Sequence, residues 1–282
     1  MAVPTLPLDT TTSATQESVR FSLVFDDVWI SFGDVEVLKG VSFKLAFGET
    51  KALFGVAGSG KSTILKLALG LLRPDAGRVV ALGEDVESIS EDDLFQLRGK
   101  IGMVFQESAL FDSLTVRENV AFRLTEEHGI YDEAIDQRVR ESLRFVELEH
   151  TVDLNPSELS GGMRRRVAIA RAIITQPELL LYDSPTGGLD PVTSNTIIEL
   201  IMKQRDVYRT SSLLVTHRLQ DAFTMATHQF DLKTNTMRAL PRGQYCDVPM
   251  SFLILRDGKV AFDGDLHQLA TTKDEYIREY IS

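Results

Sequence analysis

GVAGSGKST, residues 55–63, follows a strand-like apolar run, KALF, and leads into a helix-forming stretch, KSTILKLALGLL. It fits the pattern G-x-x-x-x-G-K-[ST] in the strand–loop–helix context that the pattern requires. Its glycines permit backbone angles and close approaches that a Cβ would prevent. Successive backbone N–H groups can then point into one concavity, toward which the following helix turns the positive end of its dipole. The stretch therefore predicts a phosphate-binding loop at the end of a central strand.

The polar residues of this loop have separate predicted roles. The Lys61 ammonium would meet the β- and γ-phosphates of a nucleotide, the Ser62 hydroxyl would bind Mg²⁺, and Thr63 would hydrogen-bond an α-phosphate oxygen. The predicted nucleotide-binding residues of the loop are Gly55, Gly58, Ser59, Gly60, Lys61, Ser62 and Thr63.

Strands alternate with helices along most of the chain. FSLVFDDVWISF and VSFKLAF, within residues 21–47, predict an antiparallel β region ahead of the loop. IGMVF, ELLLYD and SLLVTH predict further strands, with helical stretches at 115–146, from about residue 162, and at 191–203. This alternation is typical of an α/β fold with a mostly parallel core sheet covered by helices.

Residues 19–282 are predicted to form a single domain. Residues 1–18 are rich in Thr, Ser and Pro and predict a disordered tail. Residues 100–156 are mostly helical, which indicates a helical subdomain inserted into the sheet domain. Residues 227–248 are polar and turn-rich, so we expect a surface hairpin or loop there; an insertion that contacts a partner is the alternative.

Composition disfavours several classes of function. The net charge of −11 argues against nucleic-acid binding, and no apolar run approaches the roughly 20 residues that span a bilayer. Because Cys246 is the single cysteine, no internal disulfide can form, which fits a reducing compartment. The N-terminus has no basic start followed by an apolar core, so we expect no secretory signal. If the protein serves a membrane, another chain must supply the spanning part.

A second glycine-rich stretch, LSGGM at residues 159–163, is followed at once by RRRVAIARAI. A serine before glycines at the start of a helix is another anion-binding feature. With the phosphate loop upstream, the chain resembles the ABC ATPase family, whose signature is LSGGQ; here Met163 replaces the usual Gln. In that family the serine and the two glycines bind the γ-phosphate of an ATP held by the other subunit, and the matching residues are Ser160, Gly161 and Gly162.

The resemblance covers residues 21–264. It implies the ABC ATPase fold of P-loop NTPases, in which a mostly parallel core sheet carries an antiparallel β subdomain and a helical subdomain. It also implies ATP and Mg²⁺ as ligands and a head-to-tail dimer.

The same resemblance assigns roles to single residues. Asp183, which ends ELLLYD, matches the Walker B aspartate that holds Mg²⁺ through water. Gln106, in MVFQES, matches the Q-loop glutamine that senses Mg²⁺ and the γ-phosphate, and His217, in LLVTHR, matches the switch histidine at the γ-phosphate. Asp190 ends the D-loop GGLD, and Phe32 falls where the family stacks an aromatic ring on adenine. The implied catalytic residues are Asp183, Ser184, Gln106 and His217, and the implied metal-binding residues are Ser62, Gln106 and Asp183.

Ser184 departs from the family pattern, which places a glutamate general base directly after the Walker B aspartate. A neutral hydroxyl cannot take a proton from water at pH 7 as a carboxylate can, and loss of a general base typically costs about 10²–10⁴ in rate. Three interpretations remain. His217 and the γ-phosphate itself could suffice for slow hydrolysis, a partner subunit could carry the competent site, or the chain could bind ATP and hydrolyse little. We expect a slow but real ATPase.

FQESALFDSLTVRENVAFRL, residues 105–124, occupies the region that meets the permease in this family. It resembles the ATPases of Mla/Mce-type systems, which move phospholipids and other lipids between membranes of the bacterial envelope. The alternative is the ATPase of a polar amino-acid or osmolyte importer, which has the same order of motifs. We expect a dimer at the cytoplasmic face of the inner membrane, beneath integral-membrane permease subunits and with an Mce-type lipid-binding protein as a further partner.

Two other classes of function compete with transport. ABC-type ATPases of DNA repair or translation usually have paired cassettes, a long coiled coil or basic surfaces, whereas this chain has one cassette, no heptad run and an acidic balance. A purely regulatory ATP-binding switch is the third hypothesis and rests on Ser184. Co-purification with membrane proteins distinguishes a transporter from an ATPase of DNA repair or translation. ATP turnover distinguishes a transporter from a regulatory switch.

Overall fold

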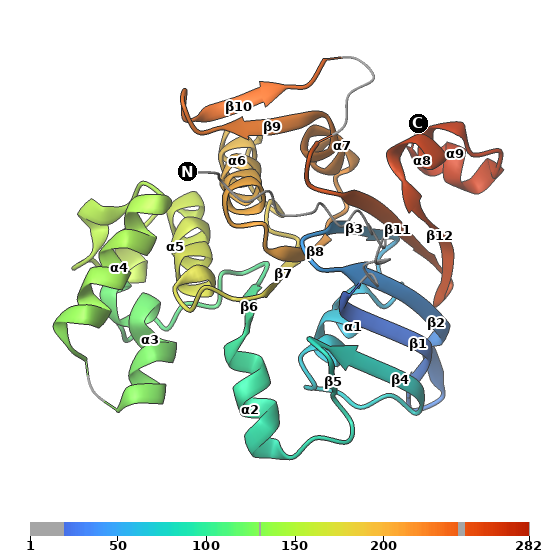
Figure 1. Ribbon diagram of the computed structural model, residues 1–282, viewed down its shortest axis with the longest axis horizontal. Coiled ribbons are helices and arrows are strands. Elements are labelled where there is room, and N and C mark those ends of the chain that lie inside the picture. The colour runs from blue at the N-terminus through green and yellow to red at the C-terminus, as the bar shows by residue number, and fades with distance from the viewer. Residues whose placement is uncertain (1–19, 130, 242–245, 282) are drawn as a thin grey trace, which may run out of the picture.

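The computed structural model describes residues 20–129, 131–241 and 246–281. A central six-stranded sheet lies between a four-stranded antiparallel sheet and a group of helices (Figure 1). The predicted disordered tail at residues 1–18 lies outside the described residues.

The central sheet has the strand order β12-β11-β3-β8-β7-β6. Neighbours from β11 to β6 run parallel, and β12 pairs antiparallel with β11. The strands β7 (LLLYD) and β8 (SSLLV) are buried over nearly their whole length because helices cover both faces of the sheet, which is why they are largely apolar. The predicted mostly parallel core sheet is confirmed. The strands span β3 (Thr50–Gly55), β6 (Ile101–Val104), β7 (Leu179–Asp183), β8 (Ser211–Val215), β11 (Met250–Arg256) and β12 (Lys259–Asp265).

The second sheet has the order β2-β1-β4-β5 and is antiparallel throughout. The Phe25 and Phe43 rings stack across its first two strands, 4.7 Å apart between centroids. Its inner face shares one hydrophobic core with the adjoining face of the central sheet. The antiparallel region predicted ahead of the phosphate loop is therefore present. Its strands are β1 (Phe21–Phe32), β2 (Val35–Ala46), β4 (Ala76–Ala81) and β5 (Glu84–Asp85).

Helix α1 (Lys61–Ala68) begins directly at the phosphate loop and is shorter than the helix expected through residue 72. It ends because Gly70 adopts a left-handed φ of 62°, with Leu94 packed so closely that a Cβ there would clash. Leu94 belongs to α2 (Glu91–Gly99), which the sequence analysis did not predict; its N-terminus is capped by the Ser90 hydroxyl, which accepts from the Asp93 N–H.

The helical group consists of α3 (Val116–His128), α4 (Glu133–Phe145) and α5 (Gly161–Ile173). The helical stretch predicted at 115–146 is divided in two, because Gly129 ends the first helix in a left-handed conformation and the Asp132 carboxylate caps the second. Short 3₁₀ turns, at Glu149–Thr151 and Pro156–Glu158, lead into α5. The predicted helical segment at 100–156 thus includes β6, which belongs to the central sheet, and its helices begin at α3.

On the other side of α5 lie α6 (Pro191–Tyr208) and α7 (Leu219–Thr227), followed by a two-stranded hairpin (Figure 1). Strands β9 (His228–Asp231) and β10 (Thr236–Ala239) form this hairpin within the polar stretch at 227–248, where a surface hairpin or loop was expected. Helices α8 (Leu266–Thr271) and α9 (Glu275–Ile281) end the described chain. None of the helices in the described ranges combines the length and apolar character needed to cross a membrane.

The base of the hairpin is held by Arg205, a buried residue near the end of α6. Its guanidinium donates to the carbonyl oxygens of Met225 (2.5 Å) and His228 (3.0 Å) and pairs with the Asp206 carboxylate at 2.6 Å. Asp206 in turn accepts from the Phe230 N–H at 2.7 Å. The hairpin is therefore attached through buried, charge-assisted hydrogen bonds.

Gly102 lets α5 approach the central sheet closely. A Cβ at this position in β6 would lie 2.4 Å from the Ala172 carbonyl oxygen, so we expect Gly102→Ala to lower the free energy of unfolding by about 3 kcal/mol. Gly129→Ala is the matched control: no described atom beyond its chain neighbours lies within 4 Å of a Cβ there, and its left-handed φ of 71° costs about 1 kcal/mol. Urea unfolding measures both, and equal losses would contradict the close approach.

Candidate nucleotide-binding site

The carboxyl ends of the parallel strands gather the residues that the sequence singles out. Val215 of β8 stands opposite Leu53 of β3 on one side and Asp183 of β7 on the other. Gly55 ends β3, so the phosphate loop emerges at the same edge of the sheet as Asp183, with β8 between the two strands. His217 follows β8 by two residues, at the same edge. The fold therefore brings three of the predicted segments together at the place where α/β sheets bind ligands.

Gln106 joins this edge from β6. Val104, at the end of that strand, stands opposite Tyr182 of β7, one residue before Asp183. The Gln106 side chain reaches the loop after β7, since a Cβ built on Gly187 would lie 3.4 Å from its Cγ. The Gln106 side chain thus lies against the segment that carries Ser184.

The phosphate loop is shaped around its glycines and its lysine. Gly58 and Gly60 have left-handed φ values of 80° and 97°, and a Cβ on Gly60 would lie 2.5 Å from the Leu38 side chain. The Lys61 ammonium donates to the carbonyl oxygens of Gly55 (2.7 Å) and Val56 (2.8 Å). It is held across the loop, close to where a phosphate would enter.

Burial lowers the pKa of Lys61, and the charge of the nearby Asp183 carboxylate opposes that shift. A lysine and an aspartate that interact electrostatically at the mouth of a glycine cradle fit a Mg²⁺–nucleotide, with the cation on the carboxylate side. Ser62 lies exposed in the first turn of α1, where its hydroxyl is accessible to such an ion. Within the described ranges, no group of three or more His, Cys, Asp or Glu side chains could hold a metal by itself.

Phe32 lies at the end of β1, where the chain turns into β2, and its ring is 50% exposed. Val37 and Leu38 of the same hairpin contact Gly60. The hairpin thus places an exposed aromatic ring on the strand pair that borders the phosphate loop, as expected for a platform that stacks on a base.

Tyr280 is a site residue that the sequence analysis missed. Its hydroxyl oxygen accepts a hydrogen bond from the Gly55 N–H at 3.2 Å, and its ring packs edge-on against Phe54. The signal in the sequence is slight: Tyr276 and Tyr280 share a face of α9, but nothing indicates what that face contacts.

Ser184 occupies a strained turn immediately after β7. Its φ of 47° is left-handed, its N–H donates to the Val215 carbonyl oxygen at 2.9 Å, and its own carbonyl accepts from the Gly187 N–H at 2.9 Å. The side chain is buried, so the hydroxyl stands within the site but offers no carboxylate.

A buried hydrogen bond that the sequence did not reveal joins this loop to the helix after His217. The Thr186 hydroxyl donates to the Asp221 carboxylate at 2.5 Å, and burial raises the pKa of Asp221. Arg218 lies 3.5 Å from the other Asp221 oxygen and donates to the Ser194 hydroxyl at 2.6 Å. The loop after β7, α6 and α7 are therefore linked.

The LSGGM segment lies on a different part of the chain from the phosphate loop. Ser160 caps α5, where its hydroxyl accepts from the Met163 N–H at 3.2 Å, and Gly162 packs against Thr193. A cavity of about 280 Å³ beside it contains no phosphate-loop residue among its described lining, which is Glu147, Ser160, Gly162, Met163, Arg166, Val192, Thr193, Thr196 and Ile197.

Asp190, the predicted D-loop residue, caps the N-terminus of α6. Its carboxylate accepts from the N–H groups of Val192 and Thr193, each at 3.0 Å, and from the Thr193 hydroxyl. The Thr193 hydrogen bonds lower the pKa of Asp190, so it stays ionised.

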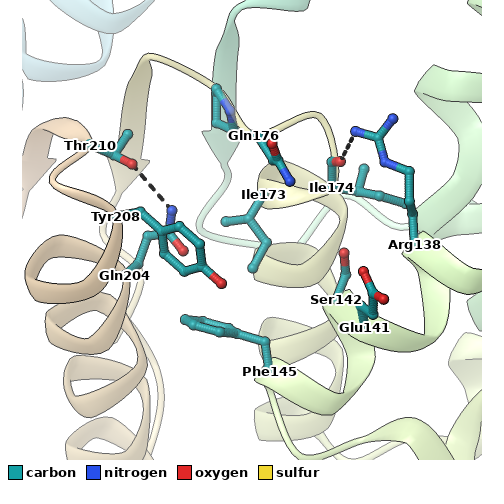
Figure 2. Close-up of a pocket in the computed structure, with 11 residues that line it drawn as sticks. Arg138, Glu141, Ser142, Phe145, Ile173, Ile174, Gln176, Gln204, Tyr208 and Thr210 are labelled. Carbon is teal, nitrogen blue, oxygen red and sulfur yellow. Dashed lines mark hydrogen bonds between the residues drawn. The ribbon is translucent and has the colours of Figure 1, made fainter. Parts of the chain in front are cut away.

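Another cavity lies at the opposite edge of the central sheet (Figure 2). It measures about 350 Å³ and opens between α4 and the ends of α5 and α6. Gln204 is almost fully buried in its wall and donates to the Thr210 hydroxyl at 3.3 Å, while its amide oxygen has no partner among the described residues. Because Pro177 and Thr210 precede β7 and β8, this cavity lies apart from the nucleotide residues.

A family model described as ABC transporter matches residues 38–187, more than half of the chain. The chain belongs to the ABC transporter family. The match includes the phosphate loop, the Q-loop, LSGGM and the loop after β7 that contains Ser184.

Three curated relatives show which ABC ATPases this chain is similar to. The protein TRIGALACTOSYLDIACYLGLYCEROL 3, chloroplastic, of Arabidopsis thaliana is 40% identical over 90% of this chain and 71% of its own length. The intermembrane phospholipid transport system ATP-binding protein MlaF of Haemophilus influenzae is 31% identical over 88% of this chain and 86% of its own. The methionine import ATP-binding protein MetN of Bifidobacterium longum is 41% identical over 64% of this chain and 44% of its own.

A solved ABC cassette has the same fold. This is a dimeric ATP-binding cassette in a post-hydrolysis state, bound to ADP and Pi, which superimposes with a TM-score of 0.71 at 29% identity and covers 86% of this chain and 98% of that one. The similarity confirms the expected ABC ATPase fold, and the MlaF match confirms the resemblance to Mla-type ATPases.

We expect Lys61→Ala to weaken ATP binding by about 10–100-fold, because it removes charge-assisted hydrogen bonds worth about 1.5–3 kcal/mol. Lys66→Ala is the control, since Lys66 is an exposed lysine of the same helix outside the loop. Titration with a fluorescent ATP analogue measures both affinities. Unchanged binding by Lys61→Ala would contradict the phosphate-loop assignment.

Proposed function

We propose that this ABC ATPase works as a head-to-tail pair that binds and hydrolyses ATP. The observation that carries the proposal is the separation, within one chain, of the phosphate loop from the capped N-terminus of α5 at LSGGM. Each is an anion-binding feature, and neither forms a complete nucleotide site within a single copy. A second copy, turned around, would place its Ser160, Gly161 and Gly162 against the γ-phosphate of the first.

In this proposal the residues at the carboxyl edge of the sheet have separate roles. Lys61 and the loop N–H groups bind the phosphates, Phe32 stacks on the adenine, and His217 contacts the γ-phosphate. Ser62, Gln106 and Asp183 would hold Mg²⁺, which would neutralise phosphate charge during hydrolysis. Asp190 supports the D-loop between the two copies by capping α6.

Ser184 makes this a slow ATPase in our proposal. The position after Asp183 is where a general base would act on the attacking water, and the buried Ser184 hydroxyl cannot take up a proton at neutral pH. His217 and the γ-phosphate are left to receive it.

We expect Ser184→Glu to raise ATP turnover by about 10²–10⁴-fold, the usual contribution of a general base. Ser184→Ala should leave turnover within about threefold of the wild type, because the hydroxyl has no acid–base role. Phosphate release by the purified protein, alone and with its permease, measures both. Loss of activity in Ser184→Ala would contradict the claim that the hydroxyl has no acid–base role. Lys61→Ala should abolish turnover in the wild type and in both Ser184 variants.

We further propose that the pair drives lipid movement beneath a membrane permease, at the cytoplasmic face of the inner membrane. Support comes from the similarity to MlaF, which is named for intermembrane phospholipid transport, over most of both chains. An Mce-type lipid-binding protein is the expected further partner. The alternative, import of a polar solute, is favoured by the similarity to MetN, which is named for methionine import.

The segment after the Q-loop supports docking to a permease. Asn119 of α3 accepts from the Phe111 N–H and donates to the carbonyl oxygens of Phe111 and Leu114, so this loop is rigidly held. The Phe111 ring packs on Phe122, 4.7 Å between centroids, yet remains 44% exposed. A groove of about 440 Å³ runs beside it along α3. Exposed aromatic rings on a fixed loop are suited to an interface.

We expect Phe111→Ser to reduce permease-stimulated turnover and transport by about tenfold or more, as for loss of an interface aromatic, while basal turnover is unchanged. Phe47→Ser is the control, since Phe47 is similarly exposed, at 37%, in the turn before β3.

The measurement uses the ATPase co-purified with its permease and reconstituted in vesicles, with fluorescent phospholipid transfer and methionine uptake followed in parallel. Lipid transfer that depends on ATP supports the Mla-type function. Methionine uptake without lipid transfer would support the importer instead.

A further inference from the structure

Arg165, in the second turn of α5, is a buried arginine whose partners all belong to the nucleotide site. The residue is 4% exposed. Its guanidinium donates to the carbonyl oxygen of Gln106 and to those of Ser184 (3.1 Å) and Pro185 (2.7 Å). It also reaches the Ser108 hydroxyl at 3.3 Å. One side chain therefore bridges the Q-loop and the loop after β7.

The charge of Arg165 is satisfied by dipoles. Its hydrogen-bond partners among the described residues are carbonyl oxygens and a hydroxyl. Burial lowers the pKa of Arg165, and the charge of Glu107 opposes that shift. A guanidinium is planar and presents its donors in a fixed fork, so it sets the spacing of the carbonyl groups it binds. Charge-assisted hydrogen bonds in a buried setting make that spacing stiff.

Arg171, further along the same helix, holds the next part of the Q-loop. It donates to the carbonyl oxygens of Ser108 (2.9 Å) and Ala109 (2.7 Å). Both of these residues have left-handed φ values, 64° and 47°, and so has Ser184 at 47°. Non-glycine residues persist in this region only where their surroundings impose it. For Ser108 and Ala109 these contacts come from Arg171 of α5. At Ser184 the contact from Arg165 adds to the backbone hydrogen bonds with Val215 and Gly187.

Helix α5 thus links two surfaces. Ser160 caps its N-terminus, and Arg165 follows five residues later, about 7.5 Å along the axis. A helix this short moves as a rigid body, so a displacement at Ser160 is carried to the Arg165 guanidinium and from there to the Gln106 and Ser184 backbones.

We propose that Arg165 is a positioning residue that couples the two ATP sites of the pair: contact of Ser160 with the ATP of the second copy sets the Q-loop and Ser184 loop of this copy. The inference rests on the proposed head-to-tail pair. It predicts that the two sites fill cooperatively, because the first ATP bound across the interface orders the loops that complete the second site.

The test compares Arg165→Lys with Arg138→Lys. Lysine keeps the charge but cannot form the fork. Arg138 of α4 donates to the Ile174 carbonyl oxygen at 2.7 Å and lines the cavity at the opposite edge of the sheet, apart from the nucleotide residues. ATP-driven pairing is followed by analytical ultracentrifugation over a range of ATP concentrations. ATP affinity is measured separately at protein concentrations where the chain is monomeric, and Tm reports folding.

We expect Arg165→Lys to keep the Tm and the monomer affinity for ATP, to weaken ATP-driven pairing by about tenfold, and to lower the Hill coefficient toward one. Arg138→Lys should behave as the wild type. If Arg165→Lys pairs as strongly and as cooperatively as Arg138→Lys, the coupling role is overturned. If the wild type itself binds ATP without pairing, the head-to-tail proposal fails, and this inference fails with it.

Ser108→Ala keeps the test decisive if Arg165→Lys does not fold. It removes the hydroxyl acceptor of Arg165 and leaves the buried charge with its carbonyl partners. A smaller loss of pairing, about threefold, is expected in the same direction. Pairing and cooperativity equal to the wild type in Ser108→Ala would overturn the proposal.

Discussion

The parallel register of β3, β8, β7 and β6 is the constraint on which the nucleotide site depends. Because Leu53, Val215 and Asp183 stand opposite one another, the loops that follow these strands must emerge side by side. Each loop then has a local feature that orients its polar residues: glycines in the phosphate loop, a left-handed turn at Ser184, and a buried Thr186–Asp221 hydrogen bond that holds the helix after His217. The sheet thus brings the loops close together, and the conformation of each loop orients its polar residues.

Helices α1 and α5 have similar N-termini, which lie on different surfaces of the chain. Each begins at a glycine-containing turn, and the N–H groups of a helix's first turn favour an anion. In a chain with a net charge of −11, Lys61 adds a positive charge at the start of α1. The separation of the two N-termini explains why a second copy is the natural way to complete the pocket.

The sequence predicted the parts of this site that depend on local chemistry. GVAGSGKST and LSGGM require particular backbone conformations, and those requirements are visible in the residues themselves. Helix α2 was missed because Leu94 and Leu97 are its buried residues, too few to give a clear period. The contacts of Arg165, Asp221 and Tyr280 join residues 19 to 225 positions apart, and such pairings arise from the topology and not from any local pattern.

The Tyr280 hydroxyl on the Gly55 N–H has a practical consequence. The final helix of the described chain is fastened to the first residue of the phosphate loop, so the C-terminal end and the nucleotide site are mechanically continuous. A substitution or label that displaces α9 would therefore also remove the acceptor of the Gly55 N–H and disturb the start of the phosphate loop.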